Sequence, residues 1–434
     1  MVHVTSADSA LASAPADDLP ASRPPAPPPE SSADGPEPQW TRRGSGAYWR
    51  ITVGLFLVGY ATFSLIYCVQ PLLPILAEAF GVSPAQSSLS LSVTTACLAV
   101  SILCFGALSE NLGRKWLMFA SMGTASVLTA VSAFLPDWTL LLITRAAIGV
   151  ALGGVPAVAM AYLAEEIEPK GLGLAMGVYI SGNAFGGMAG RVITGYVAEH
   201  FSWPTAVAFI GATGIVSVLC FALLLPESRN FARKRRFSLA DHLGKWKRHL
   251  ANPRLAALFA VGFLTMGAFV TVYNYVGFRL LAAPFSLSHG EIALIFTCYM
   301  FGIVSSSAAG WLSDRVGRGP VLTGGMVVAL AGLALTLTAS LTAIVAGIAT
   351  LTVGFFAAHS TASSWIGQTA QGAKGHASSL YLLAYYVGSS VLGSTGGWMW
   401  STGGWPRVAA LCGAAWALTA VLAVGLQVSA RRIR

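Results

Sequence analysis

The sequence predicts an all-α membrane protein with twelve transmembrane helices in two pseudo-symmetric six-helix bundles. Of its 434 residues, 55% are hydrophobic and only 10% are charged, which is too little charge to cover a soluble protein of this length. Apolar stretches of about 20 residues, long enough to cross the hydrocarbon core as a helix, recur along the chain. A short loop sequence also occurs twice, at residues 106–114 and 310–318, so the two halves are related in tandem.

The apolar stretches divide equally between the two halves. Their many glycine, alanine and serine residues let helices approach closely in a bilayer, where lipid provides no hydrophobic drive between helices. Strands of a membrane barrel would be about ten residues long with alternating faces, whereas 207–225 is apolar on every face. The predicted segments are 49–71, 86–108, 115–135, 138–163, 171–197 and 203–225 in the first half, and 255–281, 290–312, 320–340, 342–366, 375–399 and 406–427 in the second.

Lysine and arginine gather in the loops on one side of the predicted membrane. Basic loops remain in the cytoplasm, which predicts a multi-pass protein of the cell inner or plasma membrane with both termini cytoplasmic. The opposite side keeps only Arg279 and Arg407. The net charge of +9 therefore follows from basic loops beside anionic lipid, and it requires no nucleic-acid partner.

Polar stretches separate the bundles and end the chain. The N-terminal stretch is rich in Pro, Ala and Ser and cannot bury enough surface to fold, so it predicts a disordered cytoplasmic tail. The central stretch is basic and amphipathic, which predicts a cytoplasmic linker that lies partly as a helix on the membrane surface. The predicted units are the tail 1–45, the bundle 46–225, the linker 226–254, the bundle 255–428 and the basic C-terminus 429–434.

The residues give no sign of enzymatic chemistry. The six cysteines all lie in apolar segments and are typical of small buried side chains. The sequence contains no phosphate-binding loop of the G-x-x-x-x-G-K type, no clustered metal-ligand set and no nucleophile signature. We therefore expect no enzyme activity, no metal and no cofactor. The expected partners are a small-molecule substrate, protons and the lipid bilayer, and the protein is expected to work as a monomer.

The repeated loop joins two apolar segments in each half. It reads G-A-L-S-E-N-L-G-R at 106–114 and G-W-L-S-D-R-V-G-R at 310–318, and its glycines permit tight turns. This pattern resembles the signature of the major facilitator superfamily, G-x-L-(a)-D-(r)-x-G-(r)-(r/k), and the resemblance extends from about residue 46 to the end. In that family the loop helps to latch the cytoplasmic side when the transporter faces outward; a plain basic loop is the alternative.

The resemblance implies a set of latch residues in each copy. The first copy departs from the family at Glu110 and Asn111, where Asp and a basic residue are usual, so we expect the second copy to be the stronger latch. Glu165 is well placed to pair with Arg114 across the inner surface. The implied latch residues are Gly106, Glu110, Gly113, Arg114, Lys115 and Glu165 in the first half, and Gly310, Asp314, Arg315, Gly317 and Arg318 in the second.

Arg145 lies within segment 138–163, where a charge is costly and must face a cavity or a partner. In the family, an Arg followed four residues later by Gly on this helix is linked to proton coupling. Here those residues are Arg145 and Gly149. The alternative is a structural Arg whose guanidinium is satisfied by backbone carbonyls of a neighbouring helix.

Segment 171–197 carries a glycine spacing that resembles the antiporter motif of drug exporters. The matching glycines are Gly173, Gly182, Gly186, Gly187 and Gly190. The spacing is kept, but Gly187 stands where the family has Pro and Arg191 stands where it has a final Gly. This resemblance favours the drug and sugar efflux branch, although close helix packing alone also explains dense glycine.

Arg191 is difficult to explain as a purely structural residue, because it lies in a membrane helix where a glycine is expected. We predict that it faces the central cavity and contacts an anionic or polar substrate group or a carboxylate; extension to the outer headgroups is the alternative. Aromatic and amide side chains are predicted to line the same cavity, and each could equally be a packing residue. They are Tyr67, Gln70, Asn183, Tyr273, Asn274, Tyr275, His359, Trp365, Tyr381, Tyr385 and Tyr386.

No Asp or Glu lies near the middle of any apolar segment. Proton coupling needs a group whose pKa changes between states, which leaves Glu78, His359, and Glu165 or Glu166 as candidates. The predicted function is export of a small organic compound in exchange for protons. The lack of deep carboxylates favours one alternative, an importer or facilitator of a metabolite or organic anion. A transport-inactive membrane sensor is a further alternative.

Overall fold

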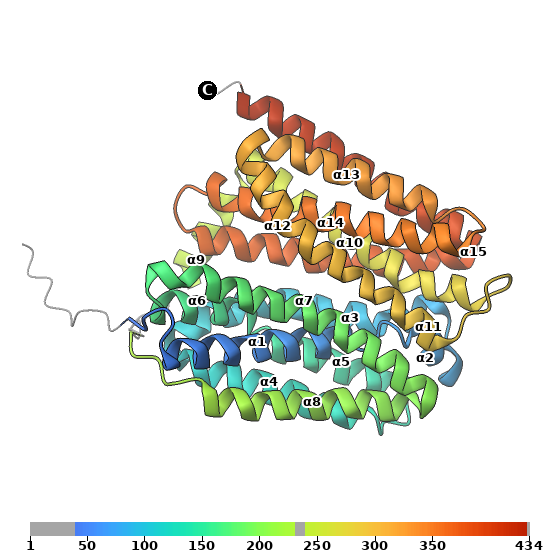
Figure 1. Ribbon diagram of the computed structural model, residues 1–434, viewed down its shortest axis with the longest axis horizontal. Helices are drawn as coiled ribbons and strands as arrows, with labels where there is room; N and C mark the ends of the chain where they lie inside the picture. Colours follow the sequence, from blue (N-terminus) through green and yellow to red (C-terminus); the bar gives the residue numbers. More distant parts are fainter. Residues whose placement is uncertain (1–39, 231–238, 432–434) are drawn as a thin grey trace, which may run out of the picture. The chain divides into compact units, whose positions relative to one another are not determined.

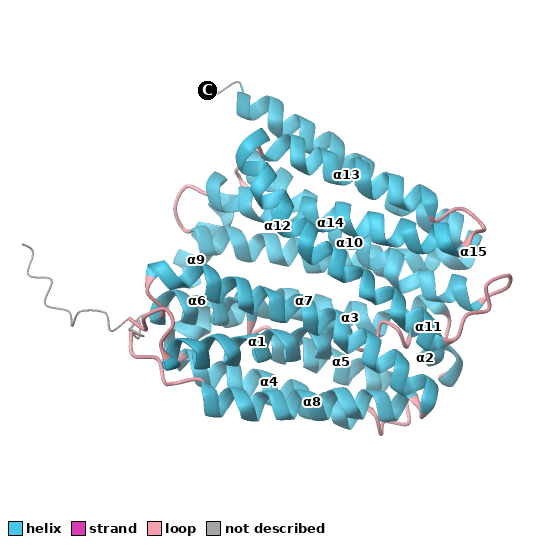
Figure 2. Ribbon diagram, in the orientation of Figure 1, coloured by secondary structure: helices cyan, strands magenta, loops and turns pink. Residues whose placement is uncertain are grey.

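The computed structural model describes residues 40–230 and 239–431. In these ranges the regular secondary structure is helical, apart from one isolated bridge between Thr41 and Ile167 (Figure 2). The predicted tail 1–45 lies outside the described residues as far as position 39. Residues 231–238 of the linker and 432–434 of the C-terminus also lie outside them.

The first half contains eight helices where six segments were predicted. One extra helix is short and lies between the first two predicted segments, and the other arises because the fourth segment is interrupted. The fourth is broken at Gly153–Val155, before Pro156, which has no N–H to continue a helix. Ser83 and Gln86 form a capping box at the start of the helix that begins at Pro84. The helices are α1 (Gly46–Tyr67), α2 (Leu73–Ala79), α3 (Pro84–Leu112), α4 (Arg114–Ser132), α5 (Trp138–Leu152), α6 (Pro156–Glu166), α7 (Pro169–His200) and α8 (Trp203–Leu224).

The second half follows the same order with two local differences. Its second segment contains a short 3₁₀ turn, η1, and its last two segments are two helices that meet at a kink and share the label α15. That element bends at Gly403 and Gly404, where Gly404 has a φ of 59°. The elements are α9 (Leu239–Leu250), α10 (Pro253–Leu281), α11 (His289–Leu294), η1 (Ile295–Cys298), α12 (Tyr299–Val316), α13 (Arg318–Leu335), α14 (Leu341–Thr369) and α15 (Lys374–Arg431).

Eight helices of the described residues are long and apolar enough to cross a membrane when α15 is counted once. Dividing α15 at its bend, and adding α4, α7 and the α5–α6 pair, gives the twelve predicted segments. The protein is therefore an all-α membrane protein, as predicted.

The two copies of the repeated loop have the same backbone conformation. Gly113 joins α3 to α4 with a φ of 84°, and Gly317 joins α12 to α13 with a φ of 90°. A residue with a Cβ rarely adopts such an angle. This explains why a glycine stands at the same place in both copies.

The helices form two groups, α1–α8 and α10–α15 (Figure 1). In the first, α1 packs against α7 and α8; in the second, α10 packs against α15. We name the two ends of the helix groups after a helix at each. The α9 end is the end at which α1, α7, α10 and α13 begin. The α11 end is the end at which these helices finish. The groups meet where α3 packs on α15, α7 on α11 and α12, and α2 on α10. Near the α11 end, Gly397 lies against Ala85 and the Gly290 N–H donates to Glu199.

Candidate functional site

Arg191 on α7 is the centre of the candidate site. Its side chain is only 2% exposed, so it does not extend to the headgroup region. Its Nε donates a hydrogen bond of 2.6 Å to Oε1 of Gln70, and Nη1 donates to the carbonyl of Gly187 one turn earlier. The charge is therefore held inside the protein by an amide and a backbone carbonyl.

Aromatic rings from both halves surround the Arg191 guanidinium. Its central carbon lies 4.1 Å from the ring centroid of Tyr67, 4.7 Å from that of Tyr299 and 5.3 Å from that of Phe296. Such ring faces attract a cation, and the attraction is larger when the pair is desolvated. Among the described residues no carboxylate forms an ion pair with Arg191. The site is thus a buried cation at the junction of the two halves without a fixed anion.

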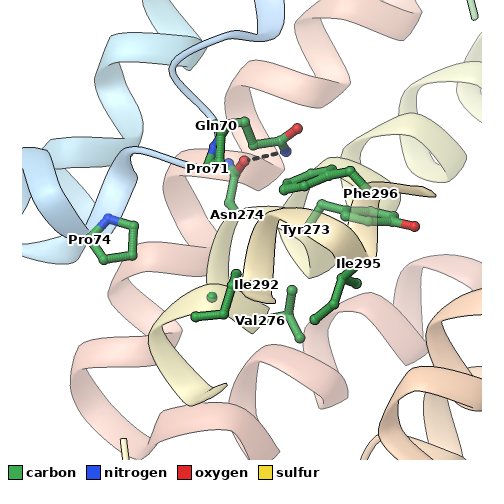
Figure 3. Close-up of a pocket in the computed structure, with 10 residues that line it drawn as sticks. Gln70, Pro71, Pro74, Tyr273, Asn274, Val276, Ile292, Ile295 and Phe296 are labelled. Carbon is green, nitrogen blue, oxygen red and sulfur yellow. Dashed lines mark hydrogen bonds between the residues drawn. The ribbon is translucent and has the colours of Figure 1, made fainter. Parts of the chain in front are cut away.

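Gln70 extends this contact to the second half. Its Nε2 donates a hydrogen bond of 2.7 Å to Oδ1 of Asn274 on α10 (Figure 3). Both amides line a cavity of about 10 Å³ that also contacts Pro74 and Ile292, which is room for about one water. Nδ2 of Asn274 and the hydroxyl of Tyr67 are buried without a hydrogen-bond partner among the described residues.

The other predicted lining residues have different surroundings. The Tyr273 hydroxyl is 2.8 Å from the Thr352 hydroxyl, and its ring centroid lies 5.2 Å from that of Phe296 and 5.1 Å from that of Tyr299. The Tyr275 hydroxyl donates to the Gly393 carbonyl at 2.9 Å. Nδ1 of His359 is 2.9 Å from the Tyr381 hydroxyl, and its ring centroid is 4.7 Å from that of Tyr385. Asn183 lies against Gly59 at the crossing of α7 and α1. The structure therefore places Tyr67 and Gln70 against Arg191, with Asn274 bonded to Gln70 and Tyr273 packed on Phe296 and Tyr299.

Arg145 is held by backbone carbonyls and is 1% exposed. It donates to the carbonyls of Leu65 at 3.0 Å, Ile66 at 2.6 Å and Ser90 at 3.1 Å. The first two belong to the last turn of α1, where carbonyls lack intrahelical partners. This arrangement matches the alternative in which Arg145 has a structural role and its guanidinium is satisfied by backbone carbonyls. A role in proton coupling stays a prediction.

Close helix packing accounts for several predicted glycines. On α7, a Cβ at Gly182, Gly186 or Gly190 would overlap atoms of α1, and a Cβ at Gly149 would overlap the carbonyl of Thr94 on α3. Gly187 instead lies beside Arg191, and Gly173 has open space around it. Spacing by four residues therefore places three motif glycines along one helix crossing.

Several of the predicted latch residues contact their own half or the start of the linker. Arg114 donates to Glu165 at 2.6 and 3.1 Å and to the Ser109 hydroxyl at 2.6 Å. Lys115 lies 3.6 Å from Glu227. In the second half Arg318 donates to the Ser364 hydroxyl at 3.2 Å, and Arg315 lies 3.8 Å from the ring centroid of Trp311. The surroundings of Gly106 and the side chain of Glu110 lie outside what the structure describes.

Glu166 anchors the start of the linker, and its role in proton coupling stays a prediction. Its carboxylate is 1% exposed and accepts from the Ser228 hydroxyl at 2.5 Å and from the backbone N–H groups of Arg229 and Asn230 at 2.7 and 3.0 Å. Further along the linker, His242 of α9 lies 2.8 Å from His376 at the start of α15, measured between ring nitrogens. The linker is therefore attached to both halves.

Phe296 and Tyr299 were not predicted from the sequence as site residues. They lie in an apolar segment in which an aromatic residue is most simply explained by packing. The 3₁₀ turn η1 ends next to Tyr299 and precedes the regular helix α12. The contacts of α7 with η1 and α12 identify them, and no local sequence pattern encodes those contacts.

Comparison with known proteins agrees with this architecture. The family model described as "Major Facilitator Superfamily" matches residues 51–281 and 273–432. The chain is 45% identical over 372 residues to "Inner membrane transport protein YnfM" of Escherichia coli, covering 86% of this chain and 89% of the relative. It is 45% identical over 364 residues to "Uncharacterized MFS-type transporter YybF" of Bacillus subtilis, covering 84% and 90%.

A solved structure has the same fold at low sequence identity. The nucleoside transporter NupG superposes with a TM-score of 0.71 at 13% identity, covering 87% of this chain and 99% of that one. The family match and the two relatives indicate a protein of membrane transport and not an enzyme. The chain belongs to the major facilitator superfamily.

Proposed function

We propose that this protein exports a small organic compound by alternating access, in exchange for protons, and that the compound carries an anionic group which contacts Arg191. The observation that carries this proposal is the buried guanidinium at the junction of the two halves. Family members of this kind move their halves around a site near the bilayer midplane. A charge inside the membrane is a functional-site hypothesis by default.

The surroundings of Arg191 favour an aromatic or planar organic anion. A buried charge is normally paired, and here the described residues supply ring faces and amides in place of a carboxylate. The planar guanidinium can bind a carboxylate or sulfonate through two parallel N–H groups. Phe296 and Tyr299 would contact the apolar body of the same molecule.

Proton exchange is supported by two weaker observations. The glycine spacing of α7 resembles that of proton-coupled exporters, and His359 is a group that ionises near neutral pH in water. His359 lies 2.9 Å from the Tyr381 hydroxyl on α15, a helix that packs on α3 across the junction. We propose His359 as the proton-coupling group.

A facilitator of organic anions is the second candidate. The specific observation that favours it is the lack of any Asp or Glu near the middle of the apolar segments. Without such a group, Arg191 could carry an anion down its gradient without exchanging a proton.

Proteoliposomes that contain a pH-sensitive dye distinguish these functions. The probes are benzenesulfonate and phthalate as aromatic anions, methanesulfonate as a small anion and benzyltrimethylammonium as a matched cation. We expect the aromatic anions to cross and to drive a counterflow of protons, with protein-free liposomes as the control. Anion flux without proton flux would identify a facilitator, and transport of the cation alone would overturn the assignment of Arg191.

The two copies of the repeated loop are expected to contribute unequally to transport. Asp314→Asn should lower the rate by roughly fivefold, the effect of losing about 1 kcal/mol of contact, and should exceed the effect of Glu110→Gln. The reason is that the second copy retains the family's Asp and basic residue. Initial rates of probe uptake at equal protein test this order. A larger effect of Glu110→Gln would show that the first copy is the stronger latch.

A further inference from the structure

Gln70 makes one hydrogen bond within its own half and one to the other half, and its two bonds fix its orientation. An arginine N–H can only donate, so Oε1 of Gln70 faces Arg191 at 2.6 Å. Its Nε2 must then face the second half, where it donates to Oδ1 of Asn274 at 2.7 Å. Gln70 and Asn274 are 2% and 1% exposed. The state of Arg191 is thus connected through one carboxamide to the contact between the halves.

Gln70 and Asn274 bring the two halves into contact just beyond the end of α1 and near the end of α10. Any rotation of one half against the other must change this contact.

The contact is not symmetric in charge. Gln70 bonds to the Arg191 guanidinium, whereas Nδ2 of Asn274 is buried without a partner among the described residues. In the part of the chain that the structure describes, Gln70 therefore couples a charge to the inter-half contact.

We propose that Gln70 is a positioning residue through which substrate binding at Arg191 releases the closed α11 end. An anionic group takes the Arg191 N–H that Gln70 accepts in this structure, because an ionised acceptor binds it more strongly than an amide does. The carboxamide then turns, its bond to Asn274 breaks and the two halves separate at the α11 end. This inference rests on the proposed function, in which an anion contacts Arg191.

The test measures the opening of the α11 end by pulsed electron paramagnetic resonance. Spin labels are attached to Phe201→Cys and Leu337→Cys after the native cysteines are replaced. These positions are 73% and 52% exposed, and they follow the ends of α7 and α13 at the α11 end. In the otherwise unchanged protein, benzenesulfonate should increase the population with the longer distance.

Asn274→Leu removes the inter-half bond and leaves the contact between Gln70 and Arg191. Without any probe, the ratio of open to closed molecules should rise roughly fivefold, the effect expected for one lost hydrogen bond. By linkage, benzenesulfonate should bind more tightly by up to the same factor. The more conservative Asn274→Ser serves as a second variant, and size-exclusion chromatography checks that both are folded.

Ser390→Ala is the matched control, because Ser390 also bonds across the junction. It contacts the Thr95 hydroxyl at 2.7 Å and the Ser92 carbonyl at 2.8 Å, and it has no connection to Arg191. In Ser390→Ala, the distances between the spin labels should still respond to benzenesulfonate. In Gln70→Glu that response should be lost, because the new carboxylate binds the Arg191 guanidinium in place of the probe.

The outcomes separate this proposal from the proposed function. Unchanged distances and probe affinity in both Asn274 variants, together with loss of probe transport in Arg191→Gln, would overturn the role of Gln70 and leave the anion site intact. Normal probe transport by Arg191→Gln would instead overturn the anion site. A loss of the probe response in Ser390→Ala equal to that in Gln70→Glu would also contradict the coupling through Gln70.

Discussion

Arg191→Gln is expected to lower the transport of aromatic anions by roughly a hundredfold, because hydrogen bonds to a charged group contribute about 1.5 to 3 kcal/mol. The variant keeps a side chain that can contact Gln70, but it removes the positive charge and the paired N–H groups. Arg191→Lys should retain part of the rate, since the charge remains and the planar fork is lost. Initial uptake rates of benzenesulfonate in proteoliposomes measure both effects.

Arg407→Gln is the control for loss of a positive charge. Arg407 is exposed and lies just after the bend of α15 at the α11 end. Its replacement should leave the rate within about a factor of two, because exposed charges are screened. Equal losses in Arg407→Gln and Arg191→Gln would indicate a general effect of net charge and not a site at Arg191.

Arg145→Met is expected to lower the free energy of unfolding by about 3 kcal/mol or more. The side chain is buried and donates to three backbone carbonyls, from the last turn of α1 and from α3. The Ser90 carbonyl keeps the Thr94 hydroxyl as a donor at 3.0 Å, but the Leu65 and Ile66 carbonyls at the end of α1 lose the guanidinium. A buried carbonyl left without a donor costs about 1 to 3 kcal/mol, and lipid offers no replacement. Denaturant or thermal unfolding in detergent, followed by circular dichroism, tests the loss.

Arg50→Met separates this effect from the loss of any arginine near a helix. Arg50 is exposed and donates to the Leu223 carbonyl at 3.3 Å, so its replacement should change stability by less than about 0.5 kcal/mol. Transport by folded Arg145→Lys gives a second readout. A stable Arg145→Met protein that has lost only proton coupling would contradict the structural role and support the coupling role.

Hydrophobic length and charge predicted most of the fold. These signals are local: about 20 apolar residues must form a helix in lipid because no water satisfies the backbone there. The break at Gly153–Val155 was not predicted from the sequence, whereas the non-helical Gly403 and Gly404 fall in the predicted gap between segments 375–399 and 406–427. The glycines at 113 and 317 could be predicted from the sequence, since each copy of the repeat needs the same positive φ.

The candidate site was predictable only in part. Arg191 stood out because a charge in a membrane helix is expensive, and Gln70 and Asn274 stood out as polar groups in apolar segments. Phe296 and Tyr299 could not be separated from packing residues, because their role arises from the contacts of η1 and α12 with α7. Arg145 was equally conspicuous in the sequence, but α1 and α3 supply its partners.

The most direct measurement is a structure of the protein with a transported aromatic anion bound, such as 4-iodobenzenesulfonate, whose iodine locates the molecule. The account predicts the sulfonate within hydrogen-bond distance of the Arg191 guanidinium, with Gln70 turned away from Arg191 and from Asn274. A sulfonate bound elsewhere between the halves, with the contacts of Arg191, Gln70 and Asn274 unchanged, would contradict it.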